Sequence, residues 1–359
     1  MAAARLQIPT RLTVECAAAM TLTAPPETAA TAVARDDVAN APELGLQARA
    51  ALEARLEARL GRVHARSRLG IEEDHAAQVF HRARSVFHPE NWYSFASVIR
   101  GSLRLVGAHG RARRNARTLA VVHHRPTLPA LPRAFHGYRI LHLSDLHIDV
   151  SEETAHAIIS AARAVEYDLC VLTGDYRFRT SGDIEPALRN MERLRASLAG
   201  NVYGVLGNHD SVLMLPALED MGIRVLMNES VVLERGGEHL YLSGIDDAHF
   251  FGVENFEKAL AGVPEEGVTV LLSHTPEVFR QAAHSGIDLL LCGHTHGGQI
   301  CLPGNIPVLL DAAIPRHLGR GAWRYRDMLG YTSPGAGTSI AEVRLNCPAE
   351  ITVHTLQCR

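Results

Sequence analysis

The sequence predicts an α/β fold with a mainly helical extension in front of it. From Phe135 onward, short apolar segments of strand length alternate with segments of helical periodicity, and further strands follow late in the chain. The 359 residues are 47% apolar and 21% charged, a globular composition that suits one large domain with an extension, or two domains. It excludes a fully disordered chain, a collagen-like repeat and a small disulfide scaffold.

The first 133 residues divide into a tail and an extension. Residues 1–43 are rich in Ala, Thr and Pro and show little periodicity, so we predict a disordered tail. Residues 44–133 are predicted to form a helical, arginine-rich extension that ends in a linker at Pro126–Pro132. Its two helical stretches are Leu44–Arg68 and Ala76–Val106, the second one broken at Pro89.

Residues 134–359 are predicted to form the α/β domain itself. Buried strands are continuous apolar runs, whereas amphipathic helices repeat apolar residues three or four positions apart. On these criteria the expected strands are 139–143, 169–172, 202–206, 231–233, 240–243, 268–272 and 287–291. The expected helices are 152–165 with Ser151 as its cap, 184–198, 215–221 and 276–283. The segment Ile340–Leu356 is expected to hold two strands around a turn at Cys347-Pro348.

Charge is unevenly divided along the chain. Residues 1–133 carry 19 arginines against 11 acidic residues, a net +8, whereas residues 134–359 carry 17 basic and 28 acidic residues, a net −11. Such asymmetry predicts different roles for the two parts. The six cysteines form no CxxC pair, which favours a reducing compartment. Because no apolar stretch reaches the length of a bilayer span, we expect a cytoplasmic protein, with peripheral attachment to a membrane as the alternative.

Polar motifs follow five of the predicted strands directly. Because ligand sites of α/β sheets gather at the carboxyl ends of strands, we expect these motifs to meet in space. Each motif alone occurs by chance in many proteins, but the ordered set is specific. Along the chain they are Asp145-Leu146-His147, Gly174-Asp175, Gly207-Asn208-His209-Asp210, His274 and Gly293-His294-Thr295-His296.

These residue types predict a binuclear metal site. Aspartate oxygen, asparagine carbonyl and imidazole nitrogen together suit borderline divalent ions such as Mn, Fe or Zn. Two ions about 3.5–4 Å apart need a bridging carboxylate between them. Alternation along an extended segment places Asp145 and His147 on one side of the chain, and the same alternation lets His294 and His296 serve one ion each.

The five motifs resemble the signature of the calcineurin-like metallophosphoesterase superfamily, which is D-x-H, GD, GNH(D/E), H and GHxH. The resemblance covers roughly residues 134–359 and implies a four-layered α/β/β/α sandwich. Two further stretches, His294–Gln299 and Arg344–Ile351, are similar to the YkuE-type branch. That branch includes bacterial phosphodiesterases and a UDP-diacylglucosamine pyrophosphatase of lipid A synthesis. Where the branch often has Arg-Gly-Leu-Gly, this chain has Ser333–Gly337, without the arginine.

The resemblance also implies a role for each motif residue. His209 would assist the leaving group, and Asp210 would orient His209. The nucleophile would be a metal-bridging hydroxide, because two cations lower the pKa of bound water. The metal is expected to be Mn, with Fe or Zn as alternatives. The implied ligands of the first ion are Asp145, His147, Asp175 and His296, and those of the second are Asp175, Asn208, His274 and His294.

The substrate and the partners leave several interpretations open. The expected substrate is a phosphate ester with a phosphodiester or pyrophosphate bond. One alternative is a UDP-sugar lipid cleaved at a membrane surface, with residues 76–125 as the peripheral membrane contact and Arg111–Arg117 on anionic headgroups. A non-catalytic binding protein on the same fold is another alternative. Nucleic acid is not expected as a partner, because no recognised binding module accompanies the arginines.

Residues outside the motifs are expected to have structural roles, with two exceptions left open. The apolar stripe in the extension either packs on the α/β domain or forms an interfacial helix; its members are Trp92, Phe95, Val98 and Ile99. Arg177 and Arg179 either bind substrate phosphate or are solvated. Cys292 is expected to be a buried residue of a strand, and Asp246 and Asp247 are expected to form a turn. The remaining histidines, including His142, His249 and His354, are expected on the surface or in the core with their polar atoms hydrogen-bonded.

Overall fold

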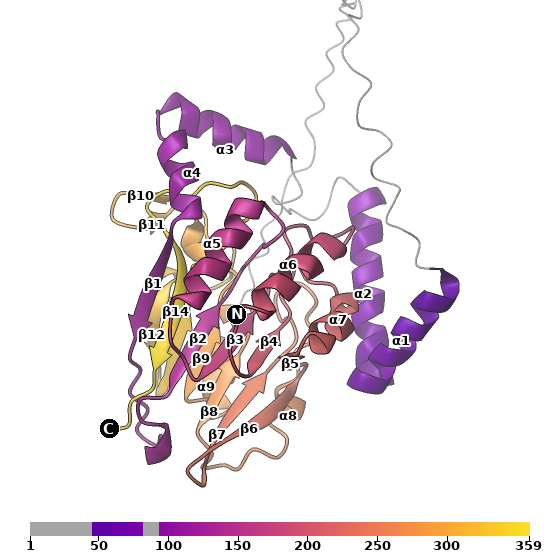
Figure 1. The fold of residues 1–359 in the computed structure, drawn as a ribbon, viewed down its shortest axis with the longest axis vertical. Coiled ribbons are helices and arrows are strands. Elements are labelled where there is room, and N and C mark those ends of the chain that lie inside the picture. Colours follow the sequence, from indigo (N-terminus) through magenta and orange to yellow (C-terminus); the bar gives the residue numbers. More distant parts are fainter. Residues whose placement is uncertain (1–44, 82–92) are drawn as a thin grey trace, which may run out of the picture. The chain divides into compact units, whose positions relative to one another are not determined.

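The computed structural model describes residues 45–81 and 93–359, so the predicted tail at 1–43 lies outside the described residues. Within these ranges two six-stranded sheets pack face to face (Figure 1). The first sheet has the order β1 (Leu119–His124), β14 (Ala349–Thr355), β2 (Arg139–Leu143), β3 (Leu169–Thr173), β4 (Val202–Val205) and β5 (Ile223–Val225). The second has the order β12 (Gly321–Tyr325), β13 (Met328–Thr332), β9 (Leu289–Cys292), β8 (Thr269–Leu272), β7 (Glu238–Gly244) and β6 (Glu229–Arg235). A separate hairpin pairs β10 (Cys301–Leu302) with β11 (Ile306–Pro307).

Apolar residues on both faces of each sheet build four layers. Along β2, Leu141 and Leu143 join a cluster with α5 (Glu152–Arg163), α6 (Glu185–Arg195) and α7 (Leu215–Asp220), whereas Ile140 joins a cluster between the two sheets. A third cluster lies between the second sheet and the short helices α8 (Phe256–Ala259) and α9 (Phe279–His284). The predicted α/β fold and the four-layered α/β/β/α sandwich are therefore confirmed.

Parallel pairing gathers the strand ends that carry the motifs. β3 pairs in parallel with both β2 and β4, and β8 pairs in parallel with β9. β3, β8 and β9 are buried along their whole length, which explains why they are continuous apolar runs in the sequence. The carboxyl ends of β2, β3 and β4 thus share one edge of the first sheet, and those of β8 and β9 share one edge of the second.

The extension contains four helices in its described part. α1 (Leu46–Leu60) and α2 (Arg62–His81) replace the single helix expected at Leu44–Arg68, because Gly61 between them has a φ of 86° and ends α1. α3 (Tyr93–Leu105) and α4 (His109–Arg117) follow, and the expected break at Pro89 lies outside the described residues. None of the helices in 45–81 and 93–359 combines the length and the hydropathy that a bilayer crossing needs.

Several strands differ from the expectation. Only β14 forms within Ile340–Leu356, and the residues before it make irregular structure in which Ile340 and Asn346 have φ values of 60° and 55°. No strand was expected at β1, which pairs in parallel with β14 and adds an edge to the first sheet. β5, β10 and β11 were also not expected, because they have only two or three residues. Nor were β12, which is mostly unburied, and β13, whose apolar run Gly330 interrupts. The limits of the three predicted domains stay a prediction.

Candidate metal centre

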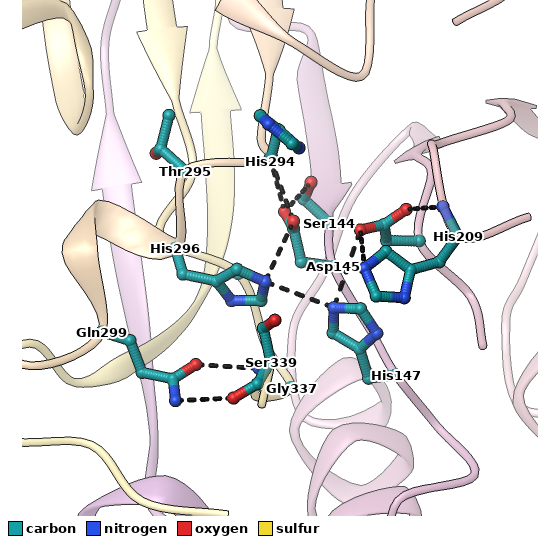
Figure 2. Close-up of polar contacts among 12 residues, drawn as sticks. Ser144, Asp145, His147, His209, His294, Thr295, His296, Gln299, Gly337 and Ser339 are labelled. Atoms are coloured by element: carbon teal, nitrogen blue, oxygen red, sulfur yellow. Dashed lines mark hydrogen bonds and ion pairs between the residues drawn. The ribbon is translucent and has the colours of Figure 1, made fainter. Parts of the chain in front are cut away.

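The seven predicted metal ligands are buried and come together where the strand ends of the two sheets meet. Figure 2 labels four of them, Asp145, His147, His294 and His296. The ligands form two groups that share Asp175. In the first group, ligand atoms of Asp145, His147, Asp175 and His296 all lie within 4.8 Å of one another, and the same holds for Asp175, His274 and His294 in the second. Asn208 completes the second group, since its Oδ1 lies 2.8 Å from His274 Nε2 and 2.9 Å from His294 Nδ1.

Five of these ligands adopt the left-handed backbone conformation. Their φ values run from 39° to 69°, at Asp145, His147, Asp175, His294 and His296. A non-glycine residue in this region costs about 1–3 kcal/mol when strained, and such residues concentrate at functional sites. Main-chain hydrogen bonds hold the conformation: Asp145 N donates to Gly174 O and His147 N to Asp175 O, both at 3.0 Å. The loops are thus shaped to aim side chains inward.

Two motif glycines allow the main chain to approach the carboxylates closely. A Cβ added at Gly293 would lie 1.9 Å from Ser144 Oγ and 2.2 Å from Asp145 Oδ2. A Cβ added at Gly207 would lie 2.3 Å from Asp175 Oδ1. Any side chain at either position would therefore displace a carboxylate of the site.

Hydrogen bonds on the far side of three imidazoles turn their Nε2 atoms toward the site. The Nδ1 atoms of these rings lie 2.7–2.8 Å from main-chain oxygens, His147 from Arg177, His274 from Thr173 and His209 from Phe178. Because a carbonyl only accepts, each Nδ1 carries a proton, and a ring that is neutral then has its lone pair on Nε2, toward the site. This is the arrangement found around metal-ligating histidines.

The remaining rings also fit a cation. His147 Nε2 and His296 Nε2 lie 3.2 Å apart, with both rings buried, so two ring nitrogens converge on one point. Burial lowers the pKa of His147 to about 3 and lowers the pKa of His296 well below its ordinary value, which keeps both rings neutral. In the second group the ring nitrogen of His294 that faces the other ligands is Nδ1, which lies 3.2 Å from His274 Nε2. Two neutral ring nitrogens that face each other with their lone pairs cannot hydrogen-bond to one another, but both can bind a divalent ion.

The pKa values of the two carboxylates in the site are shifted in opposite directions. Burial raises the pKa of Asp145 to about 6. Burial alone would also raise the pKa of Asp175, but the rings of His274 and His209 hold it well below its ordinary value. In turn Asp175 raises the pKa of His274 to about 10 against the effect of burial. Divalent ions would offset the same buried negative charge, so the donor set fits the predicted ions.

Comparison with known proteins identifies the domain that carries this site. Residues 138–298 match the family described as calcineurin-like phosphoesterase. They form a calcineurin-like phosphoesterase domain. The predicted superfamily and the predicted enzyme class, a metal-dependent phosphoric ester hydrolase, are therefore confirmed.

Relatives extend the likeness beyond the matched residues. The chain is 29% identical over 227 residues to the uncharacterized metallophosphoesterase YkoQ of Bacillus subtilis, which covers 60% of this chain and 83% of YkoQ. It is 25% identical over 277 residues to YkuE of the same organism, covering 73% of this chain and 94% of YkuE. It is 29% identical over 231 residues to the phosphodiesterase YaeI of Escherichia coli, covering 61% and 82% of the two chains.

Asp210 of the phosphoesterase domain contacts the main chain and not the ring that it was expected to orient. Its Oδ2 accepts from Asp175 N at 2.7 Å and from Gly207 N at 2.9 Å, and its Oδ1 accepts from Tyr176 N at 2.8 Å. Burial, followed by the charge of Asp175, raises the pKa of Asp210 to about 6. The His209 ring is instead oriented by a main-chain carbonyl. Asp210 thus ties the loop of Asp175 to the loop of His209.

Arg177 follows neither of the two interpretations left open for it. It is 4% exposed, and its guanidinium donates to the main-chain oxygens of His209 and Thr180, so it is neither solvated nor free to bind substrate. Arg179 is exposed. Asp247 forms the expected turn, because its Oδ2 accepts from Phe250 N at 2.7 Å. Cys292 fills buried strand β9, as expected.

Two buried side chains that the motifs do not include support the loops around the site. Arg344 donates to the main-chain oxygens of residues 334, 335 and 337 at 2.6–3.0 Å, and its guanidinium lies 3.4 Å from His296 Nδ1. Gln299 exchanges two hydrogen bonds with the main chain of Ser339, each 2.8 Å long (Figure 2). Both residues lie in the stretches that resemble the YkuE-type branch, and that resemblance is the feature of the sequence that could have indicated them.

The extension contributes one wall of a cavity that opens on the metal ligands. The cavity has a volume of about 280 Å³ and reaches from Asp175 and His209 to Val98 and Leu103 on α3. Of the predicted apolar stripe, Trp92 and the side chain of Phe95 lie outside the described residues. Ile99 packs against the domain beside Leu103, whereas Val98 is 60% exposed. The stripe thus divides between packing on the domain and facing the cavity.

Proposed function

We propose that this chain hydrolyses phosphodiester or pyrophosphate bonds with two divalent metal ions. The observation that carries the proposal is the pair of ligand groups that share Asp175. Bound ions would provide Lewis acidity for the phosphoryl group and a nucleophile at neutral pH. We expect Mn, with Fe or Zn as alternatives. The proposed ligands are Asp145, His147, Asp175 and His296 for one ion, and Asp175, Asn208, His274 and His294 for the other.

His209 is proposed to assist the leaving group. Its Nδ1 is fixed on Phe178 O, and its Nε2 lies 3.9 Å from Asp175 Oδ2 at the border of the cavity. A protonated ring in this place would donate to the leaving oxygen or to charge that develops on the phosphoryl group. Asp210 is proposed to act through position alone, because it holds the main chain on both sides of the site.

The direct test is hydrolysis of bis-p-nitrophenyl phosphate by Mn-loaded protein. The wild-type chain should release p-nitrophenolate, and Asp175→Asn should remove the activity because both ions lose a shared ligand. His209→Ala should lower kcat by about 10²–10⁴-fold, the range for a general acid. His284→Ala is the matched control, because His284 is exposed at the end of α9 and should keep wild-type activity.

Two outcomes would contradict this proposal. The first is metal-loaded protein that is inert toward diesters, monoesters and pyrophosphates alike. The second is less than one bound metal ion per chain by elemental analysis under metal-replete conditions, which would favour a non-catalytic binding protein on the same fold. Elemental analysis of the same sample also decides among Mn, Fe and Zn.

The apolar wall of the cavity supports an amphiphilic phosphoester as the substrate. Beyond the metal ligands, one wall of the cavity is formed by apolar side chains of α3 and of the segment around β11, such as Val98, Ile99, Val308 and Leu309. Ser102, Gln299, Asp311 and Ser339 are polar residues of the same lining. Ten large apolar side chains are exposed in the described ranges, and seven of them lie within residues 98–106 and 302–309. Such clustering marks binding surfaces. The substrate would place its phosphoryl group on the metal ligands and an alkyl or acyl group against α3. Membrane contact through 76–125 and a cytoplasmic location stay predictions.

Two diesters that differ only in chain length test the amphiphilic substrate. Below its micelle concentration, octyl p-nitrophenyl phosphate should be cleaved with a higher kcat/KM than the methyl ester, by about fourfold for each methylene group that becomes buried. Val98→Ser should reduce this preference, whereas Val63→Ser, at a 75% exposed position on α2, should leave it unchanged. Equal kcat/KM values for the two esters would contradict the amphiphilic substrate and leave the hydrolase proposal standing.

A further inference from the structure

A row of hydrogen-bonded side chains runs along the inner face of the first sheet, from strand to strand, toward Asp145. The row begins at His124 on β1, whose Nδ1 lies 3.0 Å from His354 Nδ1 on β14. His354 Nε2 lies 3.3 Å from His142 Nδ1 on β2. His142 Nε2 lies 2.8 Å from Thr173 Oγ1 at the end of β3. These four strands are neighbours in the first sheet, so the row passes from its edge toward the metal centre.

Two short links join the row to the metal centre. Thr173 Oγ1 donates to Ser144 Oγ at 2.6 Å, and Ser144 Oγ donates to Asp145 Oδ2 at 2.6 Å (Figure 2 shows the second link). The other carboxylate oxygen, Asp145 Oδ1, lies 3.5 Å from His296 Nε2. The hydroxyl of Ser144 therefore binds Oδ2 of Asp145, whereas Oδ1 faces the site and also accepts from His294 N at 3.0 Å.

The row is buried among mainly apolar side chains, with the ring of Tyr331 beside its three imidazoles. His354, His142, Thr173 and Ser144 have no exposed surface, and only His124 at the start of the row is partly exposed. The layer between the sheets is otherwise built mainly from apolar side chains. Burying an imidazole or a hydroxyl costs free energy unless its polar atoms are paired, and apolar side chains would fill the same space without that cost. A role beyond packing is therefore expected.

The hydrogen bonds of the row have one direction. An ionised Asp145 can only accept, so the Ser144 proton points to Asp145 and the Thr173 proton points to Ser144. Thr173 Oγ1 must then accept from His142 Nε2–H. A neutral His142 ring with its proton on Nε2 accepts at Nδ1 from His354 Nε2–H, and His354 Nδ1 accepts from His124 Nδ1–H. Every donor in the row thus points toward Asp145.

We infer that Thr173, His142 and His354 are positioning residues that hold the Asp145 carboxylate for metal binding. The inference rests on the proposed role of Asp145 as a metal ligand. With Oδ2 fixed by Ser144, the carboxylate cannot rotate freely, and Oδ1 stays directed at the point that His296 also faces. Hydrogen-bonded partners behind metal ligands of this kind set affinity as well as orientation.

The experiment compares two buried threonines of the first sheet by Mn²⁺ titration calorimetry on metal-free full-length protein. Thr173→Val keeps the shape of the side chain and breaks the row, and it should weaken one Mn²⁺ site by about tenfold or more. Thr352→Val is the matched control, because Thr352 on β14 is equally buried but donates to Glu350 Oε1 at 2.8 Å. It should bind Mn²⁺ as the wild type does. Thr173→Ser restores the hydroxyl and should restore the affinity.

Two further measurements separate positioning from a merely structural role. Urea midpoints of the metal-free variants should fall to a similar degree for Thr173→Val and Thr352→Val, so that a selective loss of Mn²⁺ affinity is not a loss of folding. Ring-nitrogen chemical shifts of the wild type should show His142 and His354 as neutral rings with the proton on Nε2. A proton on Nδ1 of His142 would overturn the direction of the row.

The outcomes distinguish this inference from the proposed function. If the wild type binds two Mn²⁺ ions and Thr173→Val binds them as tightly as Thr352→Val does, the positioning role is overturned and the binuclear site stands. If the wild type binds no Mn²⁺, Fe²⁺ or Zn²⁺, the proposed function fails and the positioning role fails with it.

Discussion

The two helical parts of the extension meet the phosphoesterase domain in opposite ways. α2 inserts a fully buried arginine, Arg68, whose guanidinium donates to Asp210 O at 3.0 Å and lies 3.2 Å above the Phe251 ring. α3 instead leaves Val98 exposed at the cavity and continues into exposed Leu105. The first part is thus built into the domain behind the site, whereas the second borders the entrance to the site.

The charge asymmetry of the sequence is met in part within the chain itself. Arginines of the extension pair with acidic residues that follow it in the chain, for example Arg59 with Glu219 and Arg117 with Glu342, each at 2.9 Å. Because both partners of these pairs are partly exposed, each pair contributes little stability, and the buried Arg68 is the exception.

The largest effect on stability is expected from Arg68→Ala. The change leaves Asp246 buried without its arginine, 3.5 Å away in the wild type, and removes a donor from Asp210 O. Breaking a buried pair by removing one partner costs about 3–5 kcal/mol, so the free energy of unfolding in urea should fall by that amount. If α2 were as loosely attached as α3, the loss would stay below about 1 kcal/mol, the level of a surface pair.

Two control variants sharpen this measurement. Arg66→Ala removes a 66% exposed arginine that pairs with Glu57, and it should change the free energy of unfolding by about 1 kcal/mol at most. The double variant Arg68→Met, Asp246→Leu replaces the buried pair with apolar side chains and should recover most of the loss. A double variant that is no more stable than Arg68→Ala would show that the loss has another origin.

The residues that we propose as metal ligands could be located from the sequence because each of their motifs follows a buried strand. Periodicity locates the strands, and parallel pairing brings their carboxyl ends together, so that Asp145, Asp175 and Asn208 had to be neighbours once the sheet formed. The types of ligand then indicate a site for divalent metal. These steps use local pattern and one general property of sheets.

The histidine row and the buried arginines around the site could not be predicted, because their partners are fixed only by tertiary structure. His124 and His354 are 230 positions apart, and nothing in either strand indicates that β1 and β14 pair. Arg177 follows a motif residue and resembles a substrate-binding arginine, yet the chain turns it back onto its own main-chain oxygens. The histidine row and the buried arginines are thus products of strand order and loop path, which a single sequence does not reveal.

A smaller effect, confined to acid pH, is expected for the contact between α2 and the domain. Burial alone would raise the pKa of Asp246, but Arg68 and His64 hold it below its ordinary value. A depressed carboxyl pKa stabilises the folded state at every pH above the unfolded value of about 4, and that stabilisation is lost as pH falls through the folded value. The difference in unfolding free energy between wild type and Asp246→Asn should therefore be constant from about pH 5 to 8 and shrink below about pH 4. A difference that grows on acidification would mean that Asp246 is protonated in the folded protein, and α2 would then be held by its apolar contacts and not by this buried charge.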